Sequence, residues 1–127
     1  MNSQDTGRCA VVLPKNLNNG ISMLVDLNIK SNFDDLINTI LKTIIEKGKG
    51  IEINTAGLKY GMPEPNPCLD IVKMYHNLGG EIITVGSDAH EVKFFAYRFD
   101  VVADMLKNAG FNYYTIFNER KPEFIRL

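Results

Sequence analysis

Segments with the apolar spacing of helices alternate with short segments rich in β-branched residues, and this order constrains the fold most. Residues 33–45 repeat apolar side chains at intervals of three and four, which is typical of an amphipathic helix. Crossovers through a helix are right-handed and join parallel strands. The sequence therefore predicts an α/β fold, with a mostly parallel sheet and flanking helices. In order, the predicted elements are helix 33–47, strand 50–54, helix 67–78, strand 82–85, helix 99–109 and strand 113–117.

Residue types at the segment ends predict where the helices begin and end. Ser31 or Asn32 is expected to cap the first helix, and Gly48 is expected to end it. Asn66 is expected to cap the second helix, because the proline after it suits a first helical position. Gly110 is expected to end the third helix. The residues of that helix expected to face inward are Val102, Met105, Leu106 and Ala109.

The remaining parts of the chain are patterned less clearly. Residues 1–30 form a weak pattern, with possible strands at 9–13 and 21–27. Residues 57–67 contain two glycines and three prolines, which predicts a loop. A last strand at 123–127 is expected to pair antiparallel with strand 113–117 through a turn near Glu119. All 127 residues are expected to form a single α/β domain.

Length and charge narrow the class of protein. A chain of 127 residues is too short for a complete eight-stranded α/β barrel of roughly 250 residues. A formal net charge of −1 gives no general attraction to nucleic acid or to an anionic membrane, so neither is expected as a partner. No apolar stretch reaches the roughly 18 to 20 residues of a membrane span, and a cytoplasmic location is expected. Cys9 and Cys68, the two cysteines, are expected to be free thiols.

Two polar segments follow predicted strands directly. Residues 54–57 come after the strand that ends near Ile53, and residues 86–90 come after the strand that ends near Val85. Functional groups of parallel α/β sheets gather beyond the carboxyl ends of the strands, and consecutive parallel strands are usually neighbours. We therefore expect the two segments to lie at the same edge of the sheet.

Asp88 and His90 lie in the second of these segments and admit two interpretations. A carboxylate oxygen and a neutral imidazole nitrogen are both good ligands of a divalent metal ion, and an irregular turn allows them to converge. Alternatively, Asp88 caps a helical turn together with Glu91, three residues later, and His90 is a surface residue. The local sequence leaves both interpretations open.

Two motifs and the end of the chain resemble the last third of histidinol phosphatases of the PHP family. The first motif, at 48–58, reads GKGIEINTAGL, and the second, at 86–90, reads GSDAH. The segment 110–122 fits the family as well, and the resemblance covers residues 31–127. Members of this family fold as a distorted (β/α)7 barrel with a metal cluster at the carboxyl edge. They hydrolyse phosphate monoesters with metal-activated water, so a partial barrel and a small phosphate monoester substrate are implied.

The resemblance also implies roles for individual residues. Asp88 and His90 would be ligands of a divalent metal ion, which would be zinc, manganese or iron. The residues implied on the substrate side are Glu52, Asn54, Thr55 and Lys59. Lys59 stands where many relatives carry an arginine, and a lysine meets a phosphate without the two-pronged geometry of a guanidinium. The alternative for Glu52 and Asn54 is a structural role, as hydrogen-bonding groups that stabilise the following loop.

Most of the metal ligands that the family uses are missing from this sequence. The chain has two histidines, and neither forms the opening His-x-His motif of the family. His76 lies within a predicted helix and is expected to be a partly exposed helix residue. A catalytic zinc site commonly uses three protein ligands, whereas Asp88 and His90 supply two. The isolated chain is therefore expected to be incomplete, with a divalent metal ion as cofactor if the site is completed and none otherwise.

Two hypotheses about function follow from this count. In the first, the chain is a metal-dependent phosphatase completed by self-association or by a partner chain that supplies the N-terminal half. In the second, it is a non-catalytic, self-associating α/β domain, or a remnant. Both hypotheses predict a homo-oligomer or a bound partner, because a barrel fragment exposes sheet edges and apolar helix faces. A nucleotide-binding module is disfavoured, since the sequence contains neither GxGxxG nor a Walker-type loop.

Overall fold

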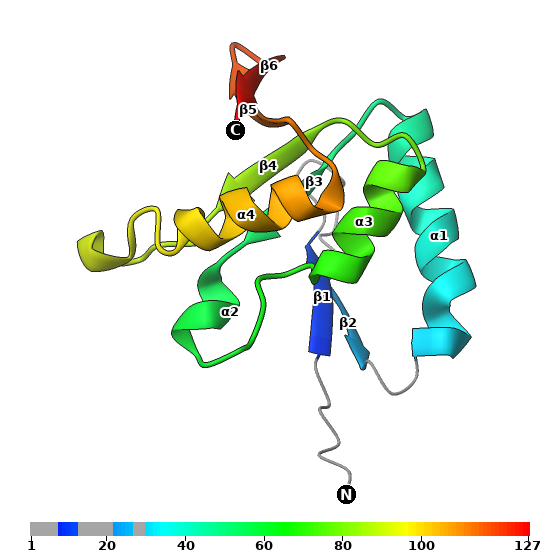
Figure 1. The fold of residues 1–127 in the computed structure, drawn as a ribbon, viewed down its shortest axis with the longest axis horizontal. Helices are drawn as coiled ribbons and strands as arrows, with labels where there is room; N and C mark the ends of the chain where they lie inside the picture. The colour runs from blue at the N-terminus through cyan, green and yellow to red at the C-terminus, as the bar shows by residue number, and fades with distance from the viewer. Residues whose placement is uncertain (1–7, 13–21, 27–29) are drawn as a thin grey trace, which may run out of the picture.

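The computed structural model describes the backbone of residues 8–12, 22–26 and 30–127 and the side chains from Phe33 onward. Strands and helices are interspersed along this part of the chain (Figure 1). The strands are β1 (Arg8–Val12), β2 (Ser22–Asp26), β3 (Ile51–Asn54), β4 (Ile83–Gly86), β5 (Tyr113–Asn118) and β6 (Lys121–Arg126). The helices are α1 (Lys30–Glu46), α2 (Ala56–Lys59), α3 (Leu69–Asn77) and α4 (Phe99–Ala109), with a 3-10 turn η2 at Val92–Phe94.

The central pair of strands is parallel, as the alternation of helix and strand predicts. Ile51 of β3 stands opposite Ile83 of β4, and Asn54 stands opposite Gly86. Strand β1 pairs antiparallel with β2, and β5 pairs antiparallel with β6. The structure thus confirms a fold of mixed helices and strands, with a small parallel sheet and flanking helices. The expectation of a mostly parallel sheet holds for β3 and β4 and not for the two other described pairs.

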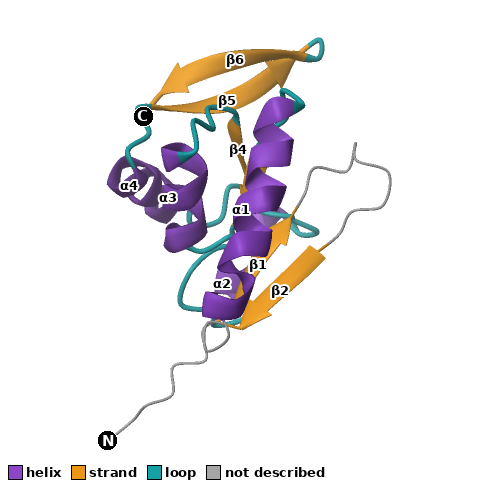
Figure 2. Cartoon of the chain, turned by 90° about the vertical axis from the view of Figure 1, so that its right-hand side faces the viewer, coloured by secondary structure: helices purple, strands orange, loops and turns teal. Residues whose placement is uncertain are grey.

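Two hairpins flank the parallel pair, one on either side, as separate two-stranded sheets. Strand β1 contacts β3, and β5 contacts β4. The buried hydroxyl of Thr115 in β5 accepts a hydrogen bond from the Ile83 amide of β4, with an N–O distance of 3.2 Å. The two hairpins lie at opposite ends of the molecule, with the helices between them (Figures 1 and 2). The predicted turn between the last two strands is confirmed, and its residues Glu119 and Arg120 have positive φ angles.

The hydrophobic core lies between the helices and the parallel pair. Strands β3 and β4 contribute Ile51, Ile53 and Ile83, which are buried. All four residues of α4 predicted to face inward are buried, which confirms that prediction. Fully burying a large aliphatic side chain stabilises the fold by roughly 1.5–3 kcal/mol. The core is therefore the main source of stability in the described part of the chain. The members contributed by the three long helices include Ile37, Leu41, Ile44, Ile71, Val72, Tyr75, Val102 and Leu106.

Two helix starts differ from the prediction. Helix α1 begins at Lys30, so Ser31 and Asn32 lie inside it and neither is its cap. Helix α3 begins at Leu69 with Cys68 as its N-cap, two residues later than predicted. The reason is that the backbone of Asn66 already pairs with Asn54, through N–O distances of 2.7 and 3.0 Å. That pairing holds Asn66 beside β3, where it cannot begin a helix.

The helix ends agree with the prediction, whereas the predicted loop differs from it in part. Gly48 and Gly110 follow α1 and α4 with φ angles of 63° and 101°, as the glycine stops predict. The predicted loop at 57–67 is preceded by a single helical turn, α2, which extends into it. The possible strands at 9–13 and 21–27 are confirmed as β1 and β2, although Leu13, Ile21 and Leu27 lie outside the described residues.

The prediction of free thiols is wrong for Cys68, which is buried and disulfide-bonded. Sequence spacing does not show which thiols a fold brings close, and this is why the prediction failed. The side chain of Cys9 lies outside the described residues. No helix among the described residues is long and apolar enough to cross a membrane.

Candidate functional site

Both motif segments leave the parallel pair at the same edge. Strand β3 ends at Asn54 and β4 ends at Gly86, and these two residues stand side by side in the register. The amide of Thr55 donates to the carbonyl oxygen of Gly86 over 2.8 Å, which continues the parallel pairing by one residue. The predicted meeting of residues 54–57 and 86–90 at one edge is therefore confirmed.

Asp88 and His90 lie close together on the surface of this edge. The Oδ1 atom of Asp88 is 4.0 Å from the Nε2 atom of His90, and the two side chains are 63% and 88% exposed, respectively. Two ligands of one tetrahedral zinc ion are about 3.4 Å apart, given bond lengths near 2.0–2.2 Å. A small side-chain rotation would thus bring both atoms to coordination distance.

The alternative role of Asp88 as a helix cap is wrong. The nearest helical turn, η2, begins after Glu91 and has no side-chain cap. Asp88 has a φ angle of 46°, in the left-handed region that aspartate tolerates better than most residues. His90 lies on the surface, which fits both interpretations of this residue. His76 lies in α3 with its ring against Phe111, and is partly exposed, as predicted.

The donor atoms at this edge suit a divalent metal ion in type but are too few to enclose one. Carboxylate oxygen and imidazole nitrogen are ligands that zinc, manganese and iron accept. Within the described residues, however, no group of three or more histidine, cysteine, aspartate or glutamate side chains is placed to hold a metal ion. Asp88 and His90 therefore form a pair of donors, and further ligands have to come from water or from another segment.

Glu52 and Asn54 share the face of β3 opposite the buried residues Ile51 and Ile53. The Oδ1 atom of Asn54 accepts a hydrogen bond from the amide of Ala56 over 2.8 Å, at the start of α2. Its Nδ2 atom lies 3.4 Å from Oε1 of Glu52. These contacts match the alternative in which the two residues stabilise the following loop. A role toward substrate stays a prediction for both.

The carboxylate of Glu52 lies directly over the end of β4. A Cβ atom placed on Gly86 would stand 3.0 Å from both Cδ and Oε1 of Glu52. Any side chain at this position would displace the Glu52 carboxylate, and glycine has none. Gly86 thus shapes the edge by allowing Glu52 to approach the backbone of the neighbouring strand.

Thr55 is enclosed rather than displayed at the edge. Its exposed fraction is 0%, and its Oγ1 atom has no hydrogen-bond partner among the described residues. A buried hydroxyl without a partner is unfavourable by about 1–3 kcal/mol unless water, a ligand or another segment supplies one.

Lys59, at the end of α2, reaches across to the second motif segment. Its Nζ atom donates to the carbonyl oxygens of Ser87 and Asp88 over 3.0 and 3.2 Å. The same atom lies 4.9 Å from the ring centroid of Phe94. The structure therefore places Lys59 at the predicted edge, with its ammonium held by the loop that carries Asp88 and His90.

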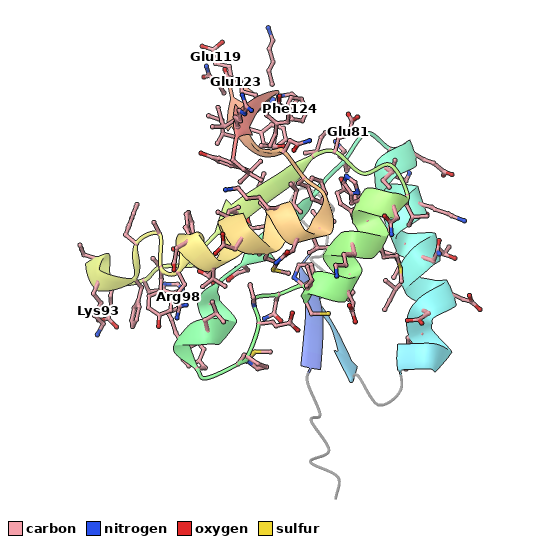
Figure 3. The ribbon with its side chains drawn as sticks, in the orientation of Figure 1. Glu81, Lys93, Arg98, Glu119, Glu123 and Phe124 are labelled. Atoms are coloured by element: carbon pink, nitrogen blue, oxygen red, sulfur yellow. The ribbon has the colours of Figure 1, made fainter. Side chains whose placement is uncertain are left out.

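Sequence reasoning missed Ser87 and Phe94, which contribute to the environment of Lys59. Ser87 is nearly buried and offers a backbone carbonyl, for which residue type gives no signal. Phe94 was an unassigned apolar residue between β4 and α4. Lys93 also places its Nζ atom 4.9 Å from this ring and pairs with Glu91 over 2.8 Å. Figure 3 shows Lys93 and Arg98 on the segment between β4 and α4, on the side of the molecule where α2 lies.

Two similar known proteins carry the same name. A protein named probable histidinol-phosphatase from Thermotoga maritima is 45% identical over 83 residues, which are 65% of this chain and 35% of that protein. A second probable histidinol-phosphatase, from Clostridium acetobutylicum, is 32% identical over 80 residues, which are 63% of this chain and 31% of that protein. No protein-family model matches the chain.

These matches confirm the resemblance that the two motifs indicated. The chain spans about a third of the length of the curated relatives it matches. The larger size of the relatives is consistent with a match to one portion of them. Over about 65% of its length, this chain is therefore a relative of the proteins named probable histidinol-phosphatase.

Proposed function

We propose that this chain is the C-terminal part of a metal-dependent phosphate monoester hydrolase of the histidinol-phosphatase type. One observation carries the proposal: the segments that begin at Asn54 and Gly86 meet at the carboxyl edge of two parallel strands. The names of the two relatives support the substrate class. We further propose that the 127 residues form one α/β domain, built as part of a (β/α)7 barrel of the PHP family.

Asp88 and His90 are the proposed metal ligands. They project from the same turn, with donor atoms 4.0 Å apart. A bound zinc, manganese or iron ion would supply Lewis-acid stabilisation of the negative charge on phosphate oxygens and lower the pKa of water. The exposure of both side chains leaves them accessible to a metal ion and to ligands from another segment.

Glu52 and Asn54 are proposed to shape the substrate side of the edge. They stand on the polar face of β3, and Glu52 lies over Gly86, beside the turn that carries Asp88. A carboxylate in this position suits a positively charged or hydrogen-bond-donating part of a substrate. The structural contacts of Asn54 with α2 fix the start of that helix, and with it the position of Lys59.

The isolated chain is proposed to be incomplete. Two donors at the edge fall short of the three that a catalytic zinc site commonly uses. We propose that a second copy or a partner chain supplies the remaining ligands.

Manganese titration followed by NMR tests the metal site directly. In the wild-type chain, paramagnetic broadening should centre on residues 87–90. The substitutions Asp88→Ala and His90→Ala should weaken it by more than about tenfold, since even the loss of a residue that supports a ligand costs that much affinity. Asp104→Ala, which removes an exposed carboxylate from α4, is the matched control and should leave the broadening unchanged.

A phosphatase assay with histidinol phosphate, with manganese or zinc added, completes the test. Turnover that Asp88→Ala abolishes and Asp104→Ala preserves would establish the enzyme proposal. Broadening that is absent from residues 87–90, or that survives in Asp88→Ala, would contradict the assignment of the metal ligands.

A second candidate function is a non-catalytic, self-associating domain. The observation that favours it is the number of large apolar side chains that the described residues expose, including Tyr60, Val92, Phe95 and Phe117. Exposed apolar surface marks contact sites where such side chains gather, as Val92 and Phe95 do in the segment between β4 and α4. Sedimentation at micromolar concentration should then show a dimer or larger species without metal binding or turnover. A monodisperse monomer would contradict self-association.

A further inference from the structure

The ammonium of Lys59 bridges two successive carbonyl groups of the loop after β4. Its distances to the oxygens of Ser87 and Asp88 are 3.0 and 3.2 Å, across 28 and 29 residues of sequence. Successive carbonyls of an extended strand point in opposite directions, so one donor reaches both only where the chain turns sharply. That turn is present, because Asp88 has a φ angle of 46°.

A left-handed aspartate needs support from its surroundings. This conformation is uncommon for residues other than glycine and persists where other contacts fix it. For the described residues, the side chain of Asp88 contacts His90 at 4.0 Å on the open surface, which provides little restraint. The two hydrogen bonds from Lys59 act on the backbone of the turn itself. They are strengthened because their donor is a positively charged ammonium group.

We propose that Lys59 is a positioning residue, whose ammonium fixes the turn at Ser87 and Asp88 and thereby sets the direction of the Asp88 and His90 side chains. The inference rests on the proposed function, because the two side chains matter as metal ligands. It differs from the expected contact of Lys59 with the substrate phosphate. Two of the three ammonium donors already serve backbone carbonyls, and the ring of Phe94 lies close to the same atom.

Lys93 offers a matched control for this role. Its Nζ atom is also 4.9 Å from the centroid of Phe94, so it shares the interaction with that ring. It pairs with Glu91 rather than with the turn, and its side chain is 65% exposed. If loss of positive charge near the ring is what matters, substitution of either lysine should have the same effect. If the hydrogen bonds to the turn matter, only substitution of Lys59 should disturb the turn.

The test compares the variants Lys59→Met, Lys59→Arg and Lys93→Met by NMR, without metal. A strong NOE between the amide and α protons of Asp88 reports the positive φ angle, and heteronuclear NOE values of residues 87–91 report order. Lys59→Met should lose the single positive-φ conformer and lower the NOE values of these amides. Lys59→Arg keeps donors that can reach both carbonyls and should preserve the turn. Lys93→Met should match the wild type.

Signals from α3 and α4 serve as the check that each variant folds. If Lys59→Met unfolds, the comparison of Lys59→Arg with the variant Lys59→Gln, which is neutral but still a donor, carries the same test. An unchanged turn in Lys59→Met, or an equal loss in Lys93→Met, would overturn the inference.

The metal titration separates this inference from the proposed function. If Lys59→Met disorders the turn and manganese broadening is absent from residues 87–90 of the wild type, the positioning of the turn stands and the metal assignment fails. If the wild type shows the broadening and Lys59→Met retains it with full affinity, Lys59 does not position the ligands. Inorganic phosphate that shifts the Lys59 side-chain signals without altering the turn would assign the residue to substrate binding instead.

Discussion

The helix-packed core and the segment at 87–98 are built in different ways. In the core, regularly spaced apolar residues of α1, α3 and α4 close over β3 and β4. In the segment, Asp88, Ala96 and Arg98 have positive φ angles although none is glycine, and Phe95 is 81% exposed. Order in the core comes from buried apolar area, whereas order in the segment comes from a few polar and aromatic contacts.

This difference separates stability from the candidate site. The residues proposed to bind metal lie in the segment that contributes little buried surface, while the strands that direct them are anchored in the core. Functional groups on loops are commonly positioned by a rigid scaffold in this way. Substitutions in the two regions should therefore differ greatly in their effect on stability.

The largest effect is expected from Leu106→Ala in α4. Leu106 is fully buried, so its removal leaves a cavity as well as lost apolar contact. The free energy of unfolding should fall by about 2–5 kcal/mol in urea titration. Leu36→Ala is the control, because Leu36 is an exposed leucine of α1 and should cost less than about 1 kcal/mol. Equal losses at both positions would break the comparison.

A smaller effect is expected at alkaline pH through Tyr75. Burial raises the pKa of the Tyr75 phenol from 10.0 to about 12, and the negative charge of Glu81 acts in the same direction. The neutral phenol, which donates to the carbonyl oxygen of Ile82 over 2.9 Å, is therefore favoured in the folded state.

The sign of the pH dependence follows from the raised pKa. The contribution of Tyr75 is complete below about pH 10 and is lost as the pH rises toward about 12. It amounts to at most about 3 kcal/mol. Between these pH values, the free energy of unfolding should fall less in Tyr75→Phe than in the wild type, because the variant has no phenol to titrate. An identical decline in both proteins would mean that Tyr75 does not titrate with unfolding.

The smallest effect is expected from Phe95→Ala in the segment. Phe95 is 81% exposed, so the free energy of unfolding should change by no more than about 0.5 kcal/mol. A loss above 1 kcal/mol that grows with protein concentration would show that a second copy covers this residue. That result would mean that self-association buries part of the segment, and it would support the self-associating alternative.

The sequence predicted the framework of the site better than its contacts. Apolar periodicity located α4 and its inward residues, and the alternation of elements predicted the parallel pairing of β3 with β4. Together these place Asn54 and Gly86 at one edge. Local residue types were less informative, since the starts of α1 and α3 differ from the positions that capping residues indicated.

The sequence by itself determined the order of helices and strands and the inward residues of α4, because both depend on repeats over a few neighbouring residues. It also determined the shared edge of the two motifs, because helical crossovers join parallel strands whose carboxyl ends meet. Only the tertiary structure decided that Asn66 pairs with Asn54, that Lys59 holds the carbonyls of Ser87 and Asp88, and that Thr55 is enclosed. These contacts join residues that are distant in sequence or involve backbone atoms, which every residue type has in common. Residue identity therefore carries no signal for them until the strands are in place.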